Sequence, residues 1–440
     1  MAGHLRLSFN QPVFFVDAIN SDVLLETQQV FSTAIFHRHS IVACSSEQNC
    51  YTPQMRKLKV AGLFAGIGGV ELGLHRSGHQ TKLLCEFDPG AAAVLAEHFP
   101  STELVGDVRN LDSVPLDIDL LAAGFPCQDL SQAGKTEGIS GDRSGLVGEV
   151  FRILDSGNIP SVLLENVPFM LQLNKGNAMR FIAHEFEKRG YHWAYRVVDS
   201  RSFGLPQRRQ RVFFLASKEL RPEKLLFQQD AGSAEPTNHE GYACGFYWTE
   251  GLRGLGWAID SVPTIKGGST IGIASPPAIW FPDGRIEKPS IEDVERLQGF
   301  EAGWTIPAQT VAKAGHRWKL VGNAVSVPTA EWIGRALLQN PKELEGLPLP
   351  FDEFRSWPKA AFGNAHDGRF EVEVSAFPVR RPRPTLIDFL KHETTPLSLK
   401  AVKGFLSRLG RGNLRYPDEF LKALLAHSKR MEEAESLQFV

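Results

Sequence analysis

Residues 58–69 read LKVAGLFAGIGG, and this stretch decides the fold class. Its first half is apolar and rich in residues typical of strands, so Val60–Phe64 is predicted as a strand. Three glycines follow within four residues and let a ligand approach the backbone closely. A helix is predicted to begin near Glu71. A strand, a glycine loop and a helix in this order indicate a nucleotide-binding unit of an α/β sheet.

Predicted strands and helices alternate from Leu58 to Ala216, which is the pattern of a doubly wound sheet. The six further predicted strands are Leu83–Glu86, Leu104–Asp107, Ile118–Ala123, Val162–Glu165, Tyr195–Val198 and Arg211–Ala216. Asp88 and Pro89 supply an N-cap and a first-turn proline for a helix ending near His98, and Gly190 can cap the end of another. The predicted fold class is therefore α/β, with a mostly parallel, Rossmann-like sheet.

The alternation stops at residue 217, and glycine, proline and aromatic residues dominate up to 290. Helical patterns return at 291–340, one starting from a capping box at Ser290 and another following Pro328. We therefore expect a smaller, loop-rich domain inserted before the chain returns to the main sheet.

Both ends of the chain are harder to interpret. Residues 378–384 form a stiff basic run, and 397–425 predict one or two amphipathic helices. Met55 is followed by a basic segment that enters the first strand, which makes it a plausible start of the native protein. The predicted domains in chain order are an N-terminal extension at 1–54, a main domain at 55–216, the loop-rich region at 217–290, a return to the main domain at 291–340 and a C-terminal extension at 341–440.

Composition places the chain among ordinary soluble proteins. Of its 440 residues 42% are hydrophobic and 22% are charged, and no apolar run reaches the ~18 residues that span a bilayer. We therefore expect a cytoplasmic protein without a membrane partner. The five cysteines are scattered without a C-x-x-C pair, which argues against a metal site and a disulfide framework. A formal net charge of -2 leaves any nucleic-acid binding to local basic clusters.

Acidic residues end the second and third predicted strands. Glu86 lies about 20 residues after the glycine loop, where a carboxylate commonly binds ribose hydroxyls. Asp107 could accept a hydrogen bond from an adenine amino group. Because the loop lacks the G-x-G-x-x-G spacing of dinucleotide folds, an adenosine-containing cofactor fits better than NAD. Taken singly, either acid could also be a solvated strand end.

The segment Gly124-Phe125-Pro126-Cys127-Gln128 directly follows the apolar strand Ile118–Ala123. A lone cysteine is usually a small buried hydrophobe. Here the glycine and proline would hold the thiol at the carboxyl edge of the sheet, where ligands of open α/β folds bind. Glu165 ends the next strand and would share that edge. An acid beside a thiolate indicates addition chemistry.

Three later motifs complete a recognisable set. They are Gln207-Arg208-Arg209-Gln210-Arg211, Arg296-Leu297-Gln298-Gly299-Phe300 and Gly322-Asn323-Ala324-Val325-Ser326-Val327-Pro328. With the glycine loop, Cys127 and Glu165 in this order, the sequence from Leu63 to Pro328 resembles the DNA cytosine-5 methyltransferase family of bacterial restriction-modification systems.

The resemblance implies a mechanism and a cofactor. The Cys127 thiolate would add to C6 of cytosine, so that C5 attacks the methyl group of S-adenosyl-L-methionine. Glu165 would protonate or hydrogen-bond N3, while Arg211 and Arg209 would hold the cytosine carbonyl and the acid. The base must be rotated out of the duplex, with Gln128 and the loop 131–144 closing over it. The implied cofactor contacts are Phe64, Ala65, Gly66, Ile67, Gly68, Gly69, Glu86, Phe87, Asp107, Val108, Gly124, Asn323 and Ala324.

The resemblance also assigns residues 217–290 to target recognition. The candidate DNA contacts are Ser131, Arg253, Lys266 and Thr270. The basic C-terminal tail would either add to the grip on DNA or act as a helical brace. The expected partner is double-stranded DNA of the bacterial nucleoid, bound by a monomer, with a cognate restriction endonuclease that is not stably associated.

Three other functions are compatible with parts of this pattern. A cytosine-5 methyltransferase acting on transfer RNA keeps the same motifs, but the distinct recognition region favours DNA. A catalytically silent DNA-binding protein on the same scaffold would not need Cys127, Glu165 and Arg211 together. A hydride-transferring Rossmann enzyme would not require Cys127 and Glu165 on adjacent strand ends.

Overall fold

A computed structural model describes residues 57–126, 145–268, 275–340, 342–344, 348–352 and 354–437. The predictions made for residues 1–54 and for Met55 lie outside these ranges. The described residues belong to one compact unit, Pro53–Val440. Within them, no helix is long and apolar enough to cross a membrane.

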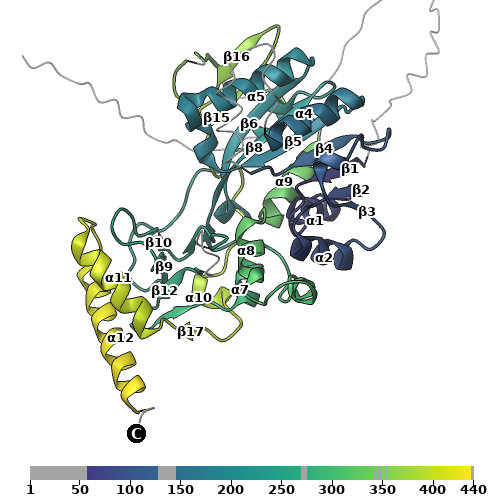
Figure 1. The fold of residues 1–440 in the computed structure, drawn as a ribbon. Coiled ribbons are helices and arrows are strands. Elements are labelled where there is room, and N and C mark those ends of the chain that lie inside the picture. Colours follow the sequence, from purple (N-terminus) through teal and green to yellow (C-terminus); the bar gives the residue numbers. More distant parts are fainter. Residues whose placement is uncertain are drawn as a thin grey trace, which may run out of the picture. The chain divides into compact units, whose positions relative to one another are not determined.

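The main domain is built on a ten-stranded sheet with the order β14-β16-β15-β6-β8-β5-β4-β1-β2-β3 (Figure 1). Five neighbouring strands are parallel: β1 Lys59–Leu63, β2 Gln80–Cys85, β3 Glu103–Val105, β4 Leu120–Ala123 and β5 Ser161–Asn166. The order β3-β2-β1-β4-β5 reverses direction at β1, so the carboxyl ends of β1 and β4 flank the crevice where such folds bind ligands.

The sheet continues beyond β5 with antiparallel strands. These are β8 Gln210–Ser217, β6 His192–Asp199, β15 Ala360–Asn364, β16 Gly368–Glu371 and β14 Leu349–Pro350. All seven strands predicted from the sequence up to residue 216 are present. The three strands from the C-terminal region were not predicted, and they extend the same sheet from its β6 edge.

Helices cover both faces of the sheet, as the doubly wound class requires. In β1, Val60 and Ala61 point to opposite faces because side chains alternate along a strand. On one face the core includes α4 Leu146–Ser156 and α5 Asn177–Lys188, and on the other α1 Gly69–Arg76 and α9 Val327–Leu337, which pack side by side (Figure 1). The α/β fold class is confirmed.

The other α-helices are α2 Pro89–His98, α6 Pro222–Leu226, α7 Ile291–Leu297, α8 His316–Asn323, α10 Leu386–Phe389, α11 Leu399–Arg411 and α12 Asp418–Leu437. Short 3-10 helices lie at Val108–Asn110, Pro168–Leu171, Leu173–Gly176, Ser200–Phe203 and Ile306–Thr310.

The predicted helix caps form as expected. The Asp88 carboxylate accepts hydrogen bonds from the backbone N–H groups of Gly90 and Ala91 at the start of α2. The Ser290 hydroxyl accepts one from the Asp293 N–H at the start of α7. These local signals set where each helix begins.

A second, five-stranded sheet has the order β10-β9-β12-β13-β17. Its strands are β9 Cys244–Phe246, β10 Ala258–Ile259, β12 Ala278–Trp280, β13 Ile286–Lys288 and β17 Thr395–Pro396. A separate short pair joins β7 Gln207–Arg208 to β11 Val262–Pro263. Strands of two or three residues are too short to show an alternating pattern, which explains why the sequence predicts only a loop-rich region here.

The C-terminal helices α11 and α12 pack against this second sheet. Phe405 and Phe420 are fully buried around Phe246, with ring centroids 5.3 and 4.9 Å from it. Arg408 donates hydrogen bonds to the carbonyl oxygens of Trp248 and Glu250 at 2.7 and 2.8 Å. The tail thus packs as a helical brace on the second sheet, and its contribution to DNA binding stays a prediction.

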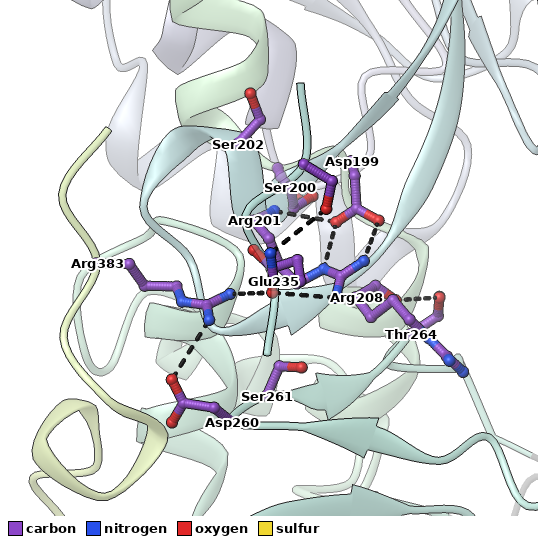
Figure 2. Close-up of polar contacts among 12 residues, drawn as sticks. Asp199, Ser200, Arg201, Ser202, Arg208, Glu235, Asp260, Ser261, Thr264 and Arg383 are labelled. Carbon is purple, nitrogen blue, oxygen red and sulfur yellow. Dashed lines mark hydrogen bonds and ion pairs between the residues drawn. The ribbon is translucent and has the colours of Figure 1, made fainter. Parts of the chain in front are cut away.

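An ion-pair network joins the main sheet, the 217–290 region and the basic run 378–384 (Figure 2). Arg201, just after β6, bonds to Asp199 at 3.0 Å and to Glu235 at 3.1 Å. Arg383 bonds to the same Glu235 at 2.9 Å and to Asp260 at 3.3 Å. All five side chains are at most 19% exposed, so water screens these charges weakly.

Glu235→Gln should destabilise the fold by about 2 kcal/mol, because two mostly buried guanidinium groups would lose their shared carboxylate. Urea unfolding measures the free energy of unfolding. The matched control is Glu240→Gln, since Glu240 is exposed in the same segment and should change it by less than about 0.5 kcal/mol. Equal stability of the two variants would contradict a structural role for the network.

Candidate functional site

The glycine loop after β1 is packed tightly at Gly68 and Gly69 and open at Gly66. Phe64 and Gly68 adopt left-handed backbone angles, with φ of 55° and 82°. A Cβ on Gly68 would overlap the Phe99 ring, and one on Gly69 would overlap the Val325 carbonyl oxygen. A Cβ on Gly66 would meet nothing within 4 Å. The loop therefore leaves room for a ligand at Gly66.

Glu86 holds this loop in place. One carboxylate oxygen accepts a hydrogen bond from the Gly66 N–H at 2.7 Å, and the other accepts one from the Asp88 N–H at 2.7 Å. Burial raises the pKa of Glu86, while these N–H donors lower it. Each oxygen keeps a lone pair that a ligand hydroxyl can use.

A cavity of about 280 Å³ opens beside the loop. Its lining residues are Phe64, Cys85, Phe87, Gly106, Asp107, Val108, Arg109 and Leu146. Phe87 is 73% exposed, so its ring is available to a planar ligand. The Asp107 carboxylate lies 2.6 Å from Arg109, and this hydrogen-bonded pair lowers the pKa of Asp107. Asp107 is thus an ionised acceptor at the cavity wall.

A smaller cavity of about 40 Å³ also has Phe64 in its lining. Its lining residues are Leu63, Phe64, Ala65, Gly66, Val70, Glu71, Ala122, Ala123, Gly124, Glu165, Asn323, Ala324 and Val325. Phe64 is common to both cavities. The pair suits an extended ligand with an aromatic part on one side and a small polar part on the other. Of the predicted cofactor residues, Ile67, Gly68, Gly69 and Glu86 line neither cavity; Glu86 and the two glycines support the loop.

Glu165 and Arg211 form an ion pair at the carboxyl end of β5, beside the start of β8. The Arg211 Nε lies 3.0 Å from Glu165 Oε1, and the two side chains are 13% and 11% exposed. Burial raises the pKa of Glu165, while the charges of Arg211 and Arg209 oppose that rise. Because burial raises its pKa, the Glu165 carboxyl group holds a proton more readily than an exposed one, which suits proton donation.

Arg209 lies beside this pair but bonds elsewhere. Its guanidinium donates to the carbonyl oxygens of Ala324 at 2.6 Å, Ile265 at 3.1 Å and Gly322 at 3.2 Å. Its Nε has no hydrogen-bond partner among the described residues. Arg209 therefore ties the end of α8 to the 262–268 segment, close to Asn323.

The turn that leads to Cys127 is attached to the same edge. Asn166, at the end of β5, donates a hydrogen bond to the Phe125 carbonyl oxygen at 2.9 Å. A Cβ on Gly124 would lie 3.6 Å from Glu165 Oε2. Cys127 itself, with Gln128 and Ser131, lies outside the described residues. The sequence reasoning did not single out Asn166, whose only signal is its place directly after Glu165.

The predicted DNA-contact residues are only partly described. Lys266 is half exposed, forms an ion pair with Glu250 and lies 3.9 Å from the centroid of the Tyr247 ring. Arg253 is exposed, and Thr270 lies outside the described residues. In the described part of the chain, no group of three or more His, Cys, Asp or Glu side chains could hold a metal ion.

A sheet whose order reverses at β1, with a glycine loop after that strand and an acid-arginine pair between β5 and β8, defines a Rossmann-like α/β fold with a ligand site at the switch point. Comparison with known proteins supports and narrows this class. Residues 58–242 match the family model described as C-5 cytosine-specific DNA methylase.

Relatives extend the match over most of the chain. It is 47% identical over 386 residues to the type II methyltransferase M2.BsuMI of Bacillus subtilis (strain 168), which covers 83% of this chain and 97% of that protein. It is 27% identical to M.MspI of Moraxella sp, over 65% of this chain and 73% of that protein, and 36% identical to M.BanI of Aneurinibacillus aneurinilyticus, over 41% and 42%. The chain therefore belongs to the C-5 cytosine-specific DNA methylase family, as a DNA (cytosine-5-)-methyltransferase of the bacterial type II restriction-modification group.

Asn166→Ala should lower kcat about tenfold, because the turn before Cys127 loses the hydrogen bond that attaches it to β5. Affinity for S-adenosylhomocysteine should stay within about twofold, since Asn166 does not line either cavity. The exposed Asn158→Ala is the matched control. Unchanged kcat in Asn166→Ala would contradict the positioning role.

The buried Glu71 should make stability depend on pH. Burial, with a smaller contribution from Glu86, raises the pKa of Glu71 from 4.5 to about 7. Between these values the folded state keeps the proton that the unfolded state releases, so stability falls as pH rises through this window. Urea unfolding near pH 5 and near pH 7.5 should show a loss larger by about 2 kcal/mol in the wild type than in Glu71→Gln. Identical pH profiles would contradict this ionisation.

Proposed function

We propose that this enzyme methylates carbon 5 of cytosine within a specific double-stranded DNA sequence, with Cys127 as covalent nucleophile and S-adenosyl-L-methionine as methyl donor. The observation that carries the proposal is the Glu165–Arg211 pair, fixed at the sheet edge next to the turn that precedes Cys127. Cytosine addition needs an acid, a cation and a thiol, and Cys127 follows the described turn directly in the sequence.

The two cavities fit the proposed donor. The larger one offers aromatic walls at Phe64 and Phe87 and an acceptor at Asp107 for an adenine ring and its amino group. Glu86 stands at the loop between strand and helix, where ribose hydroxyls would reach its free lone pairs. Gly66, Asn323 and Ala324 line the smaller cavity, where the methionine portion would lie. When bound there, the donor supplies an electrophilic methyl group on a sulfonium.

The protein groups would then act in order. The Cys127 thiolate forms a bond to C6, which moves electron density into the ring and makes C5 nucleophilic. Glu165 donates a proton or hydrogen bond to N3, and Arg211 stabilises the charge at the adjoining carbonyl oxygen. After C5 has taken the methyl group, transfer of the C5 proton to solvent water leaves its electron pair to re-form the C5–C6 double bond, which expels the Cys127 thiolate and releases 5-methylcytosine.

The target base would be rotated out of the duplex into this pocket, at a cost of a few kcal/mol. Gln128 and the 131–144 segment are proposed to close over it. Residues 217–290, completed by 395–437, are proposed to read the DNA sequence, with Ser131, Arg253, Lys266 and Thr270 among the contacts. Arg209 is proposed to act on the site through the 322–324 segment that it holds.

We further propose that the enzyme works as a monomer and protects nucleoid DNA against a cognate endonuclease to which it is not stably bound. The alternative substrate is transfer RNA, which shares the cytosine chemistry. The membership in a DNA methylase family favours DNA.

Bisulfite sequencing of DNA from a methylation-free bacterial host that expresses the chain should reveal one short, fully methylated motif. Glu165→Gln should lower the methylation rate at that motif by at least about 100-fold, because the ring charge loses its proton donor. The control Glu219→Gln, on a distant loop, should methylate normally. Methylated transfer RNA with unmodified DNA would contradict the DNA assignment, and a fully active Glu165→Gln would contradict the role of the acid.

A further inference from the structure

Glu71 is an acid that none of the roles above uses. It lies in the first turn of α1, and its side chain is only 2% exposed. A Cβ on Gly62 would overlap Glu71 Oε1, so the side chain reaches back across β1 and its carboxyl group fills the space beside Gly62. Gly62 is thus the residue that leaves room for this carboxyl group.

The carboxyl group is incompletely satisfied. Its Oε2 is buried and has no hydrogen-bond partner among the described residues. Buried polar atoms without partners are rare and commonly mark a place where a ligand or an ordered water completes the structure. Burial also raises the pKa of this group to about 7, so it can ionise near neutral pH when a cation approaches.

The position of Glu71 shows which ligand group could reach it. Glu71 lines the smaller cavity together with Gly66 and Asn323. That cavity shares Phe64 with the larger one. If the nucleoside occupies the larger cavity, as the proposed function has it, the amino-acid portion of the same molecule extends towards Glu71.

We propose that Glu71 is a cofactor-binding residue whose ionised carboxyl group accepts hydrogen bonds from the α-ammonium group of the methionine portion of S-adenosyl-L-methionine. An ammonium group offers three N–H donors and a positive charge, and both match an unsatisfied carboxylate. The carboxylate of the amino-acid portion would be repelled, so it points away from Glu71. This inference rests on the proposed identity of the methyl donor.

The first test separates the two portions of the ligand. Isothermal titration would compare S-adenosylhomocysteine with 5′-methylthioadenosine, which keeps the nucleoside but lacks the amino-acid portion. Glu71→Gln should weaken S-adenosylhomocysteine at least about tenfold and change methylthioadenosine by less than about twofold. The control Glu97→Gln, on the exposed side of α2, should change neither.

The second test uses the wild-type protein, so it does not depend on folding of a variant. An S-adenosylhomocysteine analogue without the amino group should bind at least about tenfold more weakly than the parent compound. The decarboxylated analogue, which keeps the amine, should lose much less.

Four outcomes overturn the proposal. Unchanged S-adenosylhomocysteine binding in Glu71→Gln, or an equal loss for both compounds, would make Glu71 a structural residue and leave the proposed function intact. Equal binding of the deaminated analogue and its parent would do the same. A wild-type protein that binds none of these compounds would refute the cofactor assignment itself, and this inference with it.

Discussion

The site depends on the antiparallel pairing of β8 between β5 and β6. That register sets Asn166 opposite Val212 and Glu165 opposite Phe213, so Arg211 arrives at the strand end where Glu165 lies. The two residues are 46 positions apart, yet their side chains meet at 3.0 Å in a mostly buried place. A buried carboxylate without that guanidinium would be strongly disfavoured, and a buried guanidinium without the acid equally so. The antiparallel strand β8 therefore brings Arg211 to Glu165 and balances the charge of its carboxylate.

Neighbouring groups extend this arrangement into a preorganised pocket. Asn166 attaches the turn before Cys127, Arg209 attaches the 322–324 segment, and Glu86 attaches the glycine loop. Each of these contacts ends on a backbone atom, so these three side chains fix the loops in place. The cavity walls stay available to a ligand. The acids around the cavities would favour a cationic sulfonium donor over its neutral thioether product, which helps product release.

Much of the main domain could be predicted from the sequence, because most of its strands contain buried, continuous apolar runs and caps such as Asp88 mark helix starts. The strands of the second sheet escaped prediction, since two or three residues carry no period. The additional edge strands escaped for a different reason: Ala360–Asn364 pairs with β6 across more than 160 positions, and no local signal reveals such a partner. Long-range pairing therefore limits what the sequence alone reveals about the C-terminal part.

In the site too, residues marked by local sequence signals were predicted, and residues that depend on long-range contacts were not. Glu165, Arg211 and the glycine loop were predicted because they lie at the ends of predicted strands, Arg211 at the start of one, within a recognised motif order. The sequence did not single out Glu71, because its position depends on the space that Gly62 leaves. It did not single out Asn166, because its partner is a backbone carbonyl in the turn after β4. Cys127 carries the central claim. Mass spectrometry of the complex with S-adenosyl-L-methionine and a duplex containing 5-fluorocytosine in the methylated motif tests it most directly. The account predicts a stable protein–DNA adduct that maps to Cys127 and is absent in Cys127→Ser, whereas an adduct on another residue, or one that persists in that variant, would contradict it.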